Sequence, residues 1–401
     1  MQGTVAPGFE PVRAAFIENF KSRGEWGASV CISHEGRIVV DLWGGLANQI
    51  RKPPWEADTL ATVFSCTKGM VALCMMMLAD RGRLDYDAPV AEYWPAFAQG
   101  GKSRITVRTL LNHRSGLVGV DAPITLDMLE SRPEEVSSVL EGQKPHWEPG
   151  TDQGYHAVTY GLYAGELFRR LTEESLGAFF AREVAGPLGA DVYIGLPREK
   201  EHRVATNYPV TTAERLFKIV PKLLFHPGNE GRVYRQIALG GDAAKAFANP
   251  KELGPLGIHH FNSRRVHQMV LPWASGIASA RGLCRVYTAL ANGGAIDGVT
   301  LVRPEAIAPV HARQSWVTRD RVLRKPLGFS QGFLKEETRL FSPSTESFGH
   351  AGAGGSLGFC DPKARLAIGY VKNKMDHHVR SPAAIAICHA AYGCLKTQRG
   401  G

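Results

Sequence analysis

The sequence predicts an α/β (α+β) protein in which helices flank a sheet assembled from both ends of the chain. Strand patterns occur near the N-terminus and return in the last third of the chain, helical patterns dominate the middle, and a helical pattern closes the chain. We therefore expect a sandwich domain of residues 1–120 and 270–401. A mainly helical domain, residues 121–269, is inserted between its two parts.

In the N-terminal part, two strands are predicted at residues 27–33 and 37–43, around the hairpin turn His34-Glu35-Gly36. The helices predicted here have apolar side chains three or four positions apart. They are residues 10–23, residues 68–82, which form a long apolar run, and residues 105–113, which end before Ser115-Gly116.

In the C-terminal third the apolar period changes from helical to alternating. The short strands predicted from this alternation are residues 327–334, 347–350, 356–360 and 366–371. A helix at residues 279–292, closed by Gly293-Gly294, precedes them, and a helix at residues 382–396 follows them.

Composition excludes several classes of function. Of the 401 residues, 44% are hydrophobic and 21% charged, which is ordinary for a soluble globular protein. The net charge of +9 is spread along the chain, so we expect no nucleic-acid partner, only a mild preference for anionic substrates or a basic solvated surface. Residues 1–8 lack the features of a signal peptide, and the longest apolar run, residues 70–79, is too short to cross a bilayer. These observations favour a cytoplasmic protein with no membrane partner.

Cysteine and histidine patterns suggest neither a disulfide framework nor a metal motif. The seven cysteines are scattered inside apolar segments, as is typical of reduced core thiols. We expect His259-His260 and His377-His378 to be surface or loop residues, and we expect no metal and no organic cofactor.

Ser65-Cys66-Thr67-Lys68 opens the long apolar run of the N-terminal part. Residues three apart share a helix face, so the Lys68 amine would stand beside the Ser65 hydroxyl. A serine needs a base to become a nucleophile, and burial would lower the pKa of Lys68 enough for the neutral amine to act as that base. The helix N-terminus would add a backbone N–H for an oxyanion. Because chance alone predicts about one such pair in a chain of this composition, an N-capping Ser65 and a solvated Lys68 stay open at this point.

Further motifs occur in order after this pair: Trp147-Glu148-Pro149-Gly150, Tyr155-His156-Ala157 with Gly161, and Gly349-His350-Ala351-Gly352-Ala353-Gly354-Gly355. At these residues the chain resembles the serine β-lactamase and penicillin-binding-protein superfamily, and within it the class C β-lactamases and the family VIII carboxylesterases. The segments 110–117 and 275–280 also fit this resemblance. The likeness spans roughly residues 10–397. It implies a β-lactamase-like fold.

The resemblance also implies roles for individual residues. Ser65 would be the acylated nucleophile, Lys68 its proton acceptor, and Tyr155 a second acid–base group held partly as phenolate by the lysine cation. The N–H groups of Ser65 and Ala353 would form the oxyanion hole.

The resemblance further implies a substrate-binding edge strand, His350-Ala351-Gly352, with His156 beside it. His350 would hydrogen-bond or polarise Tyr155, or else be structural only. Two departures stand out: Tyr155-His156-Ala157 lacks the family's asparagine, and His350-Ala351-Gly352 replaces Lys-Thr-Gly. Both remove groups that recognise a β-lactam. The expected function is therefore a serine hydrolase acting on small carboxylic esters.

Other functions stay open: a β-lactamase, a D-amino-acid peptidase or amidase, an acyltransferase of the same fold, or a silent binding protein. The oligomeric state and the ester are also open, because residues 121–269 carry no motif. In that segment Phe217, Leu223, Leu224, Phe225 and Tyr234 would either fill the core or line an acyl pocket.

Three residues resemble catalytic groups but are expected not to be catalytic. Ser356 matches a Gly-x-Ser-x-Gly elbow, yet a strand and turn pattern follows it where that motif requires a helix. Cys66 lacks the His–Asn context of a cysteine hydrolase. Tyr160 has the wrong spacing to the glycine and is expected in the core.

Overall fold

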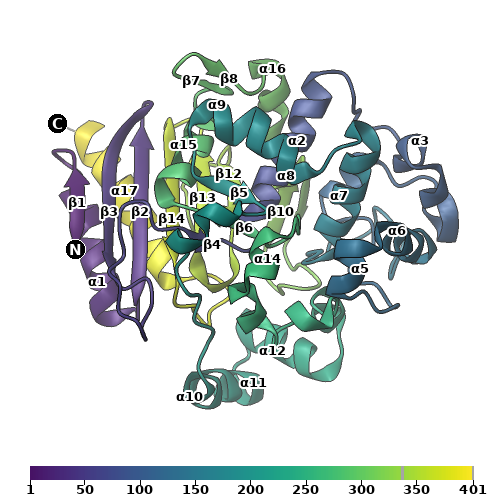
Figure 1. The fold of residues 1–401 in the computed structure, drawn as a ribbon, viewed down its shortest axis with the longest axis horizontal. Coiled ribbons are helices and arrows are strands. Elements are labelled where there is room, and N and C mark those ends of the chain that lie inside the picture. Colours follow the sequence, from purple (N-terminus) through teal and green to yellow (C-terminus); the bar gives the residue numbers. More distant parts are fainter. Residues whose placement is uncertain (336–337, 400–401) are drawn as a thin grey trace.

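A nine-stranded antiparallel sheet forms the centre of the computed structural model, which describes residues 1–335 and 338–399 (Figure 1). The strand order is β1-β3-β2-β14-β13-β12-β11-β10-β9, so strands from the two ends of the chain meet where β2 pairs with β14. Their bounds are β1 (Gln2–Val5), β2 (Gly27–His34), β3 (Arg37–Gly45), β9 (Ser315–Val317), β10 (Leu327–Ser330), β11 (Phe333–Lys335), β12 (Phe348–Ala351), β13 (Leu357–Asp361) and β14 (Leu366–Lys372).

Two smaller sheets accompany the large one. The first pairs β4 (Ala61–Thr62) and β5 (Val192–Ile194) with the two edges of β6 (Gly276–Ala278). The second is the hairpin of β7 (Ala295–Ile296) and β8 (Val299–Thr300). The first of these sheets matters for the site, because β4 leads into the segment that carries Ser65.

Alternation along the strands supplies apolar side chains to both faces of the sheet. On one face, Val30 and Ile368 belong to a core with α1 (Glu10–Ser22) and α17 (Pro382–Arg399). On the other face, Cys31 and Ala367 belong to a larger core with α2 (Cys66–Asp80) and α15 (Ala280–Ala291). The sheet is thus covered by helices on both sides, as the predicted fold class requires.

The remaining helices lie mostly on the α2 side of the sheet (Figure 1). They are α3 (Val90–Tyr93), α4 (Val107–Leu111), α5 (Leu126–Ser131), α6 (Pro133–Gly142), α7 (Thr159–Thr172), α8 (Leu176–Phe180), α9 (Gly186–Leu188), α10 (Thr212–Glu214), α11 (Val220–Phe225), α12 (Asn229–Leu239), α13 (Asp242–Ala246), α14 (Arg264–Gln268) and α16 (Pro304–Ile307). Shorter 3-10 or π turns are η1 (Pro95–Gly101), η2 (Ala181–Ala185), η3 (Arg198–Arg203), η4 (Arg215–Ile219), η5 (Lys251–Leu253), η6 (Ile258–Asn262), η7 (Ala308–His311) and η8 (Ala353–Gly355).

The predicted fold class is confirmed, and most predicted elements agree within a few residues. The strand predicted at residues 327–334 is wrong as a single strand, because the chain reverses at Gln331 (φ 46°) and Gly332 (φ 89°) to form the hairpin of β10 and β11. The predictions also missed β1 and β9, which are short edge strands. The division into two domains stays a prediction.

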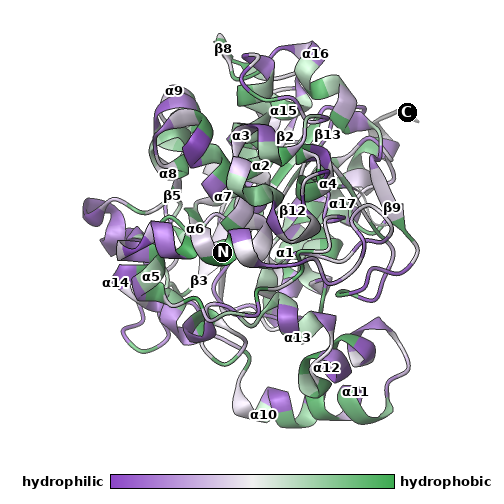
Figure 2. Cartoon of the chain, turned by 90° about the vertical axis from the view of Figure 1, so that its right-hand side faces the viewer, coloured by the Kyte–Doolittle hydropathy of each residue, from purple (hydrophilic) through white to green (hydrophobic). Residues whose placement is uncertain are grey.

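The segment of α10, η4, α11 and α12 projects from the molecule, with many apolar residues on it (Figure 2). Phe217, Leu224 and Phe225 are exposed there. Their predicted places, in a core or along an acyl pocket, are wrong for these three residues. Tyr234 is half-buried, and its hydroxyl donates to the carbonyl of His377.

All seven cysteines are buried and unpaired, as predicted. Within residues 1–335 and 338–399, no helix has the length and apolar character needed to span a membrane. The cytoplasmic location stays a prediction.

Candidate active site

Ser65 lies at the N-cap position of α2, in a turn that is held by side-chain and backbone contacts. Phe64, before it, has a left-handed φ of 46°, which costs a non-glycine residue conformational energy. The Thr67 hydroxyl donates to the carbonyl of Phe64 and accepts the N–H of Gly276 in β6 at 2.8 Å. The Ser65 side chain does not cap the helix. Its hydroxyl is therefore left for another use.

Lys68 lies beside Ser65, one helical turn further along α2. Its Nζ lies 3.2 Å from Ser65 Oγ and donates to the carbonyl of Trp273 at 3.1 Å. The side chain is fully buried, and burial lowers the pKa of Lys68 well below its usual range. A neutral amine in this position has a lone pair with which to accept the serine proton.

Gly161 explains how Trp273 reaches Lys68. A Cβ on Gly161 in α7 would lie only 2.4 Å from the backbone nitrogen of Trp273. The absence of a side chain thus lets the backbone of the segment before β6 pack directly on α7. Sequence reasoning noted this glycine by its spacing from Tyr155 but missed the Trp273 carbonyl as a ligand of the lysine.

The Tyr155 phenol is nearly buried beside the pair. The Lys68 Nζ lies 5.1 Å from the centre of its ring. Burial raises the pKa of Tyr155, and a hydrogen bond with Ser65 opposes part of that rise. The direction is opposite to the predicted partial phenolate, because burial disfavours the charged form of the phenol. Tyr155 is therefore a phenol, which holds a proton to give.

Asp320, which sequence reasoning missed, holds the backbone at Tyr155. Its buried carboxylate accepts the N–H of Tyr155 at 3.2 Å, and those of Val322 and Leu323 at 2.9 Å each. No local pattern could reveal this, since the contact joins residues 165 positions apart.

His113 packs behind Tyr155, and sequence reasoning gave it no role. Its φ is 60°, its ring centre lies 5.2 Å from that of Tyr155, and it stacks on Tyr160. His113 Nδ1 accepts the N–H of His156 at 3.0 Å. Burial lowers the pKa of His113, so the ring is neutral. The residue lies in the segment 110–117 that supported the family resemblance.

The segment after β12 closes on the nucleophile turn. A Cβ on Gly352 would lie 2.3 Å from the carbonyl oxygen of Val63, so only glycine allows this approach. Ala353, which follows, is exposed. Within the described part of the chain, the N–H groups of Ser65 and Ala353 have no hydrogen-bond acceptor. Both donors are thus available near the serine.

His350 and Ala351 are buried in β12. The His350 ring centre lies 5.9 Å from that of Tyr155, and its Nδ1 lies 2.8 Å from the carbonyl of Ala351. His350 therefore stands beside Tyr155, where the sequence placed it.

The predicted contact between His156 and substrate does not agree with its position. The ring is 1% exposed, and its nitrogens bond to the Ser115 hydroxyl at 3.0 Å and the Gly154 carbonyl at 2.5 Å. Burial lowers the pKa of His156 to about 3. Both ring nitrogens are used within the wall of the site, so His156 is a structural residue.

The three residues expected not to be catalytic are buried. Ser356 precedes strand β13 rather than a helix, so the nucleophile elbow is absent there. Tyr160 is in the core and donates to the Lys68 carbonyl at 3.3 Å. Cys66 donates to the His350 carbonyl at 3.2 Å, and burial raises its pKa to about 12.

Among the described residues, Asp376, His377 and His378 form a group that could hold a metal ion, with ligand atoms within 4.8 Å of one another. The sequence predicted no metal motif and predicted His377-His378 as surface or loop residues. In the structure, Asp376 Oδ1 forms a hydrogen bond with His378 Nδ1 at 2.5 Å. Burial is the main cause that lowers the pKa of His377. The neighbouring His378 and the cations of Lys222 and Lys218 lower it further. These cations disfavour a metal here.

Comparison with known proteins agrees with this geometry. The family model described as Beta-lactamase matches residues 12–391. This chain belongs to the beta-lactamase family. The esterase/beta-lactamase LipL of Mycobacterium tuberculosis is 34% identical over 380 residues, which cover 93% of this chain and 83% of LipL.

Solved structures of the beta-lactamase family are also similar. The crystal structure of a family VIII carboxylesterase has a TM-score of 0.85 and 39% identity, covering 98% of this chain and 99% of its own. EstA from Arthrobacter nitroguajacolicus Rue61a has a TM-score of 0.82 and 34% identity, covering 99% and 100%. The fold expected from the resemblance is thereby confirmed.

Proposed function

We propose that this protein is a serine carboxylesterase that forms an acyl-enzyme on Ser65. The observation that carries the proposal is the buried Lys68 amine, which lies 3.2 Å from the hydroxyl of Ser65, a side chain that does not cap the helix; burial lowers the pKa of this amine. A serine so placed has a base within reach of its proton, as nucleophilic catalysis requires.

The acylation step uses the groups described above. Ser65 Oγ attacks the ester carbonyl carbon while its proton passes to Lys68 Nζ. The resulting oxyanion accepts hydrogen bonds from the N–H groups of Ser65 and Ala353. The bond from the acyl carbon to the alkoxy oxygen then breaks, the Tyr155 hydroxyl gives its proton to the leaving alcohol, and Lys68 returns the serine proton to Tyr155.

Deacylation follows the same path in reverse. Water attacks the acyl carbon and gives a proton to the Lys68 amine, the Ser65 ester bond breaks, Lys68 returns that proton to Ser65 Oγ, and the carboxylic acid leaves. A low dielectric around the buried Lys68 and Tyr155 strengthens each of these interactions. No step requires a metal.

An ester is favoured over a lactam by what the site lacks. At position 350 a histidine buried beside Tyr155 stands where the family's lysine would meet a carboxylate, and position 157 is alanine. The names of relatives support esters: LipL is called an esterase/beta-lactamase, and EstB of Burkholderia gladioli an esterase. The first of these names keeps β-lactam hydrolysis as a second candidate, which nitrocefin turnover would test.

The test is turnover of a short p-nitrophenyl ester by Ser65→Ala and Ser356→Ala. Ser65→Ala is expected to lose at least about 10³-fold in kcat. Ser356→Ala, a buried serine outside the site, is the matched control and is expected to keep turnover. Loss of turnover in the Ser356→Ala variant, together with retained turnover in the Ser65→Ala variant, would overturn the proposal.

A further inference from the structure

The segment of residues 212–239 exposes large apolar side chains, and we call it the apolar hairpin. It consists of α10, η4 and α11, which run continuously from Thr212 to Phe225, followed by α12. Phe217 is 75% exposed and Phe225 81% exposed. The other exposed apolar residues of the hairpin are Leu216, Val220, Leu224 and Leu239. A soluble protein seldom gathers this much apolar surface in one place without a partner for it.

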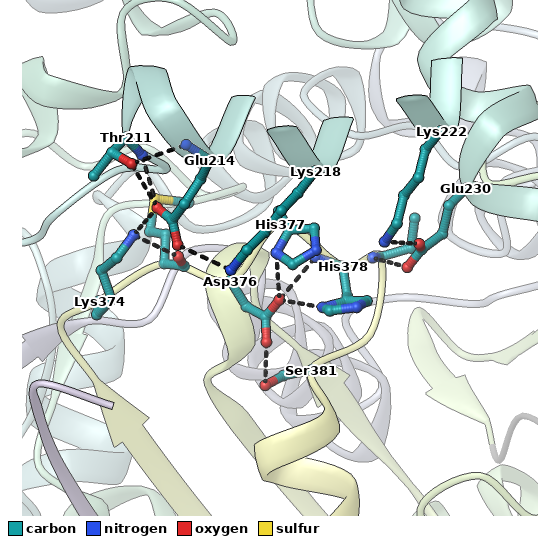
Figure 3. Close-up of polar contacts among 12 residues, drawn as sticks. Thr211, Glu214, Lys218, Lys222, Glu230, Lys374, Asp376, His377, His378 and Ser381 are labelled. Atoms are coloured by element: carbon teal, nitrogen blue, oxygen red, sulfur yellow. Dashed lines mark hydrogen bonds and ion pairs between the residues drawn. The ribbon is translucent and has the colours of Figure 1, made fainter. Parts of the chain in front are cut away.

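The charged side of the hairpin faces the protein (Figure 3). Glu214, Lys218 and Lys222 are four residues apart and so share one helix face. In Figure 3 these side chains point toward the loop that carries Lys374 and Asp376. Lys374 pairs with Glu214 at 2.6 Å, and Lys222 pairs with Glu230 of α12 at 2.5 Å. Ion pairs therefore hold the hairpin in place.

The apolar side faces outward. Leu216, Val220 and Leu224 are also four residues apart, on the face opposite the ion pairs, and all three are exposed. This is the reverse of an ordinary surface helix, whose apolar stripe faces the core. The hairpin is green at the end of the molecule in Figure 2, where it projects. Its outer face is thus available to an apolar partner.

The charge of the hairpin indicates which partner. It has five basic residues against two acidic ones, Glu214 and Glu230, so its net charge is +3 (5 − 2). Both acids are already paired. Arg215 and Arg232 have no side-chain partner within residues 1–335 and 338–399. An exposed apolar face on a segment with a net positive charge is the pattern of a helix that lies on an anionic lipid surface.

We infer that the apolar hairpin is a docking surface for an anionic lipid surface. Phe217, Leu224 and Phe225 enter the headgroup region, and Arg215 and Arg232 bind lipid phosphates. A second copy of this chain fits less well, because a two-fold interface would bring the same basic patch against itself. The inference replaces the expectation of no membrane partner, which considered only helices that span a bilayer.

Docking would take place close to the catalytic segment. Asp376, in the loop that the hairpin covers, donates its N–H to the carbonyl of Gly354 at 3.0 Å, and Gly354 follows Ala353. The loop that carries Lys374 and Asp376 therefore contacts both the hairpin and the segment of Ala353, the proposed oxyanion donor. The inference does not depend on the proposed function, because lipid binding is measured without turnover.

The test is co-sedimentation with vesicles of phosphatidylcholine alone and of phosphatidylcholine mixed with phosphatidylglycerol. The wild-type protein is expected to bind the anionic vesicles at least 10-fold more tightly, and less tightly as salt is raised. Phe217→Ser/Phe225→Ser is expected to weaken binding about 100-fold, and Arg215→Gln/Arg232→Gln about 10- to 30-fold. Ile38→Ser removes an apolar side chain that is 60% exposed on β3, away from the hairpin, and is expected to change nothing.

Two results would overturn the inference. One is wild-type protein that binds neither kind of vesicle, and the other is equal binding by the wild type and by Phe217→Ser/Phe225→Ser. A dimer in light scattering that Phe217→Ser/Phe225→Ser dissociates, without vesicle binding, would assign the face to a second copy. Circular dichroism checks that each variant is folded, and unfolding is not expected because the replaced side chains are exposed.

Discussion

Burial acts in opposite directions on the two acid–base groups beside Ser65. It lowers the pKa of Lys68, which is charged when protonated, and raises the pKa of Tyr155, which is charged when deprotonated. Burial thus favours the neutral form of both groups before substrate binds. In the proposed mechanism, the lysine accepts the serine proton and the tyrosine donates a proton to the leaving alcohol.

The pH dependence of activity tests the role of Lys68. Because burial lowers its pKa, the amine is neutral above that pKa and a cation below it. We expect kcat/KM for a p-nitrophenyl ester to be constant at high pH and to fall as pH decreases through the pKa of Lys68. Lys68→Arg, which stays charged, is expected to lose about 10²- to 10⁴-fold at every pH. An active Lys68→Arg variant would contradict the assignment.

The leaving group tests the role of Tyr155. An alkoxide leaves poorly without a proton, whereas p-nitrophenolate leaves readily. Tyr155→Phe is therefore expected to lose about 10²- to 10⁴-fold in kcat on an ethyl ester, and much less on the p-nitrophenyl ester of the same acid. Tyr160→Phe is the control, since among the described residues that hydroxyl hydrogen-bonds to the Lys68 carbonyl alone. Equal losses on both esters would mean that Tyr155 does not protonate the alcohol.

At the scale of elements, α2 is the buried helix that carries the site, and its first turn is tightly packed. A Cβ on Gly69 would lie 2.2 Å from the Tyr287 hydroxyl of α15. Contacts with β12, α7 and α8 fix the orientation of the helix. The positions of Ser65 and Lys68 depend on this packing.

Two glycine substitutions test that dependence. Gly69→Ala is expected to lower the free energy of unfolding by about 1–3 kcal/mol, because the added methyl overpacks the core. Gly393→Ala, in the helix α17 and with open space around it, is the matched control and is expected to raise stability by up to about 1 kcal/mol. Urea denaturation measures both. A neutral Gly69→Ala would show that the first turn of α2 has room to move.

Elements whose signals are local could be predicted from the sequence. The hairpin of β2 and β3 was predicted from two strand patterns around the turn His34-Glu35-Gly36, and in the structure Glu35 and Gly36 have the positive φ angles of such a turn. The reversal at Gln331-Gly332 was not, because the apolar alternation continues across it. The apolar hairpin was misjudged because helical spacing tells which residues share a face, but not whether that face meets the protein or the solvent.

The site shows the same division between local and distant contacts. Ser65 and Lys68 are one helical turn apart, so their proximity follows from the spacing. Asp320 and the carbonyl of Trp273 are brought in by tertiary packing and left no local pattern. His156 was predicted at the substrate because it follows Tyr155 in the motif, yet its side chain points into the wall.

At the scale of the whole molecule, the two cores on either face of the sheet contain all seven cysteines in buried positions. Burial raises the pKa of five of these thiols, for example that of Cys66 to about 12. A hydrogen bond with Cys284, followed by burial, raises the pKa of Cys31. Thiolates, which are the reactive form, are therefore scarce in the folded protein.

Thiol titration tests this arrangement. In the native state a thiol reagent such as dithionitrobenzoate is expected to label none of the seven cysteines within minutes, and all seven in denaturant. Turnover is expected to be the same with and without a reductant. Rapid labelling of Cys66 in the native state, with loss of activity, would show that the nucleophile turn opens to solvent.

The claim on which the account depends is that Ser65 carries the acyl group. Mass spectrometry of the protein after reaction with an alkyl p-nitrophenyl phosphonate, followed by peptide mapping, tests it most directly. We expect one adduct, on the peptide that contains Ser65, and none on the Ser65→Ala variant. An adduct on Ser356, or equal labelling of Ser65→Ala, would contradict the account.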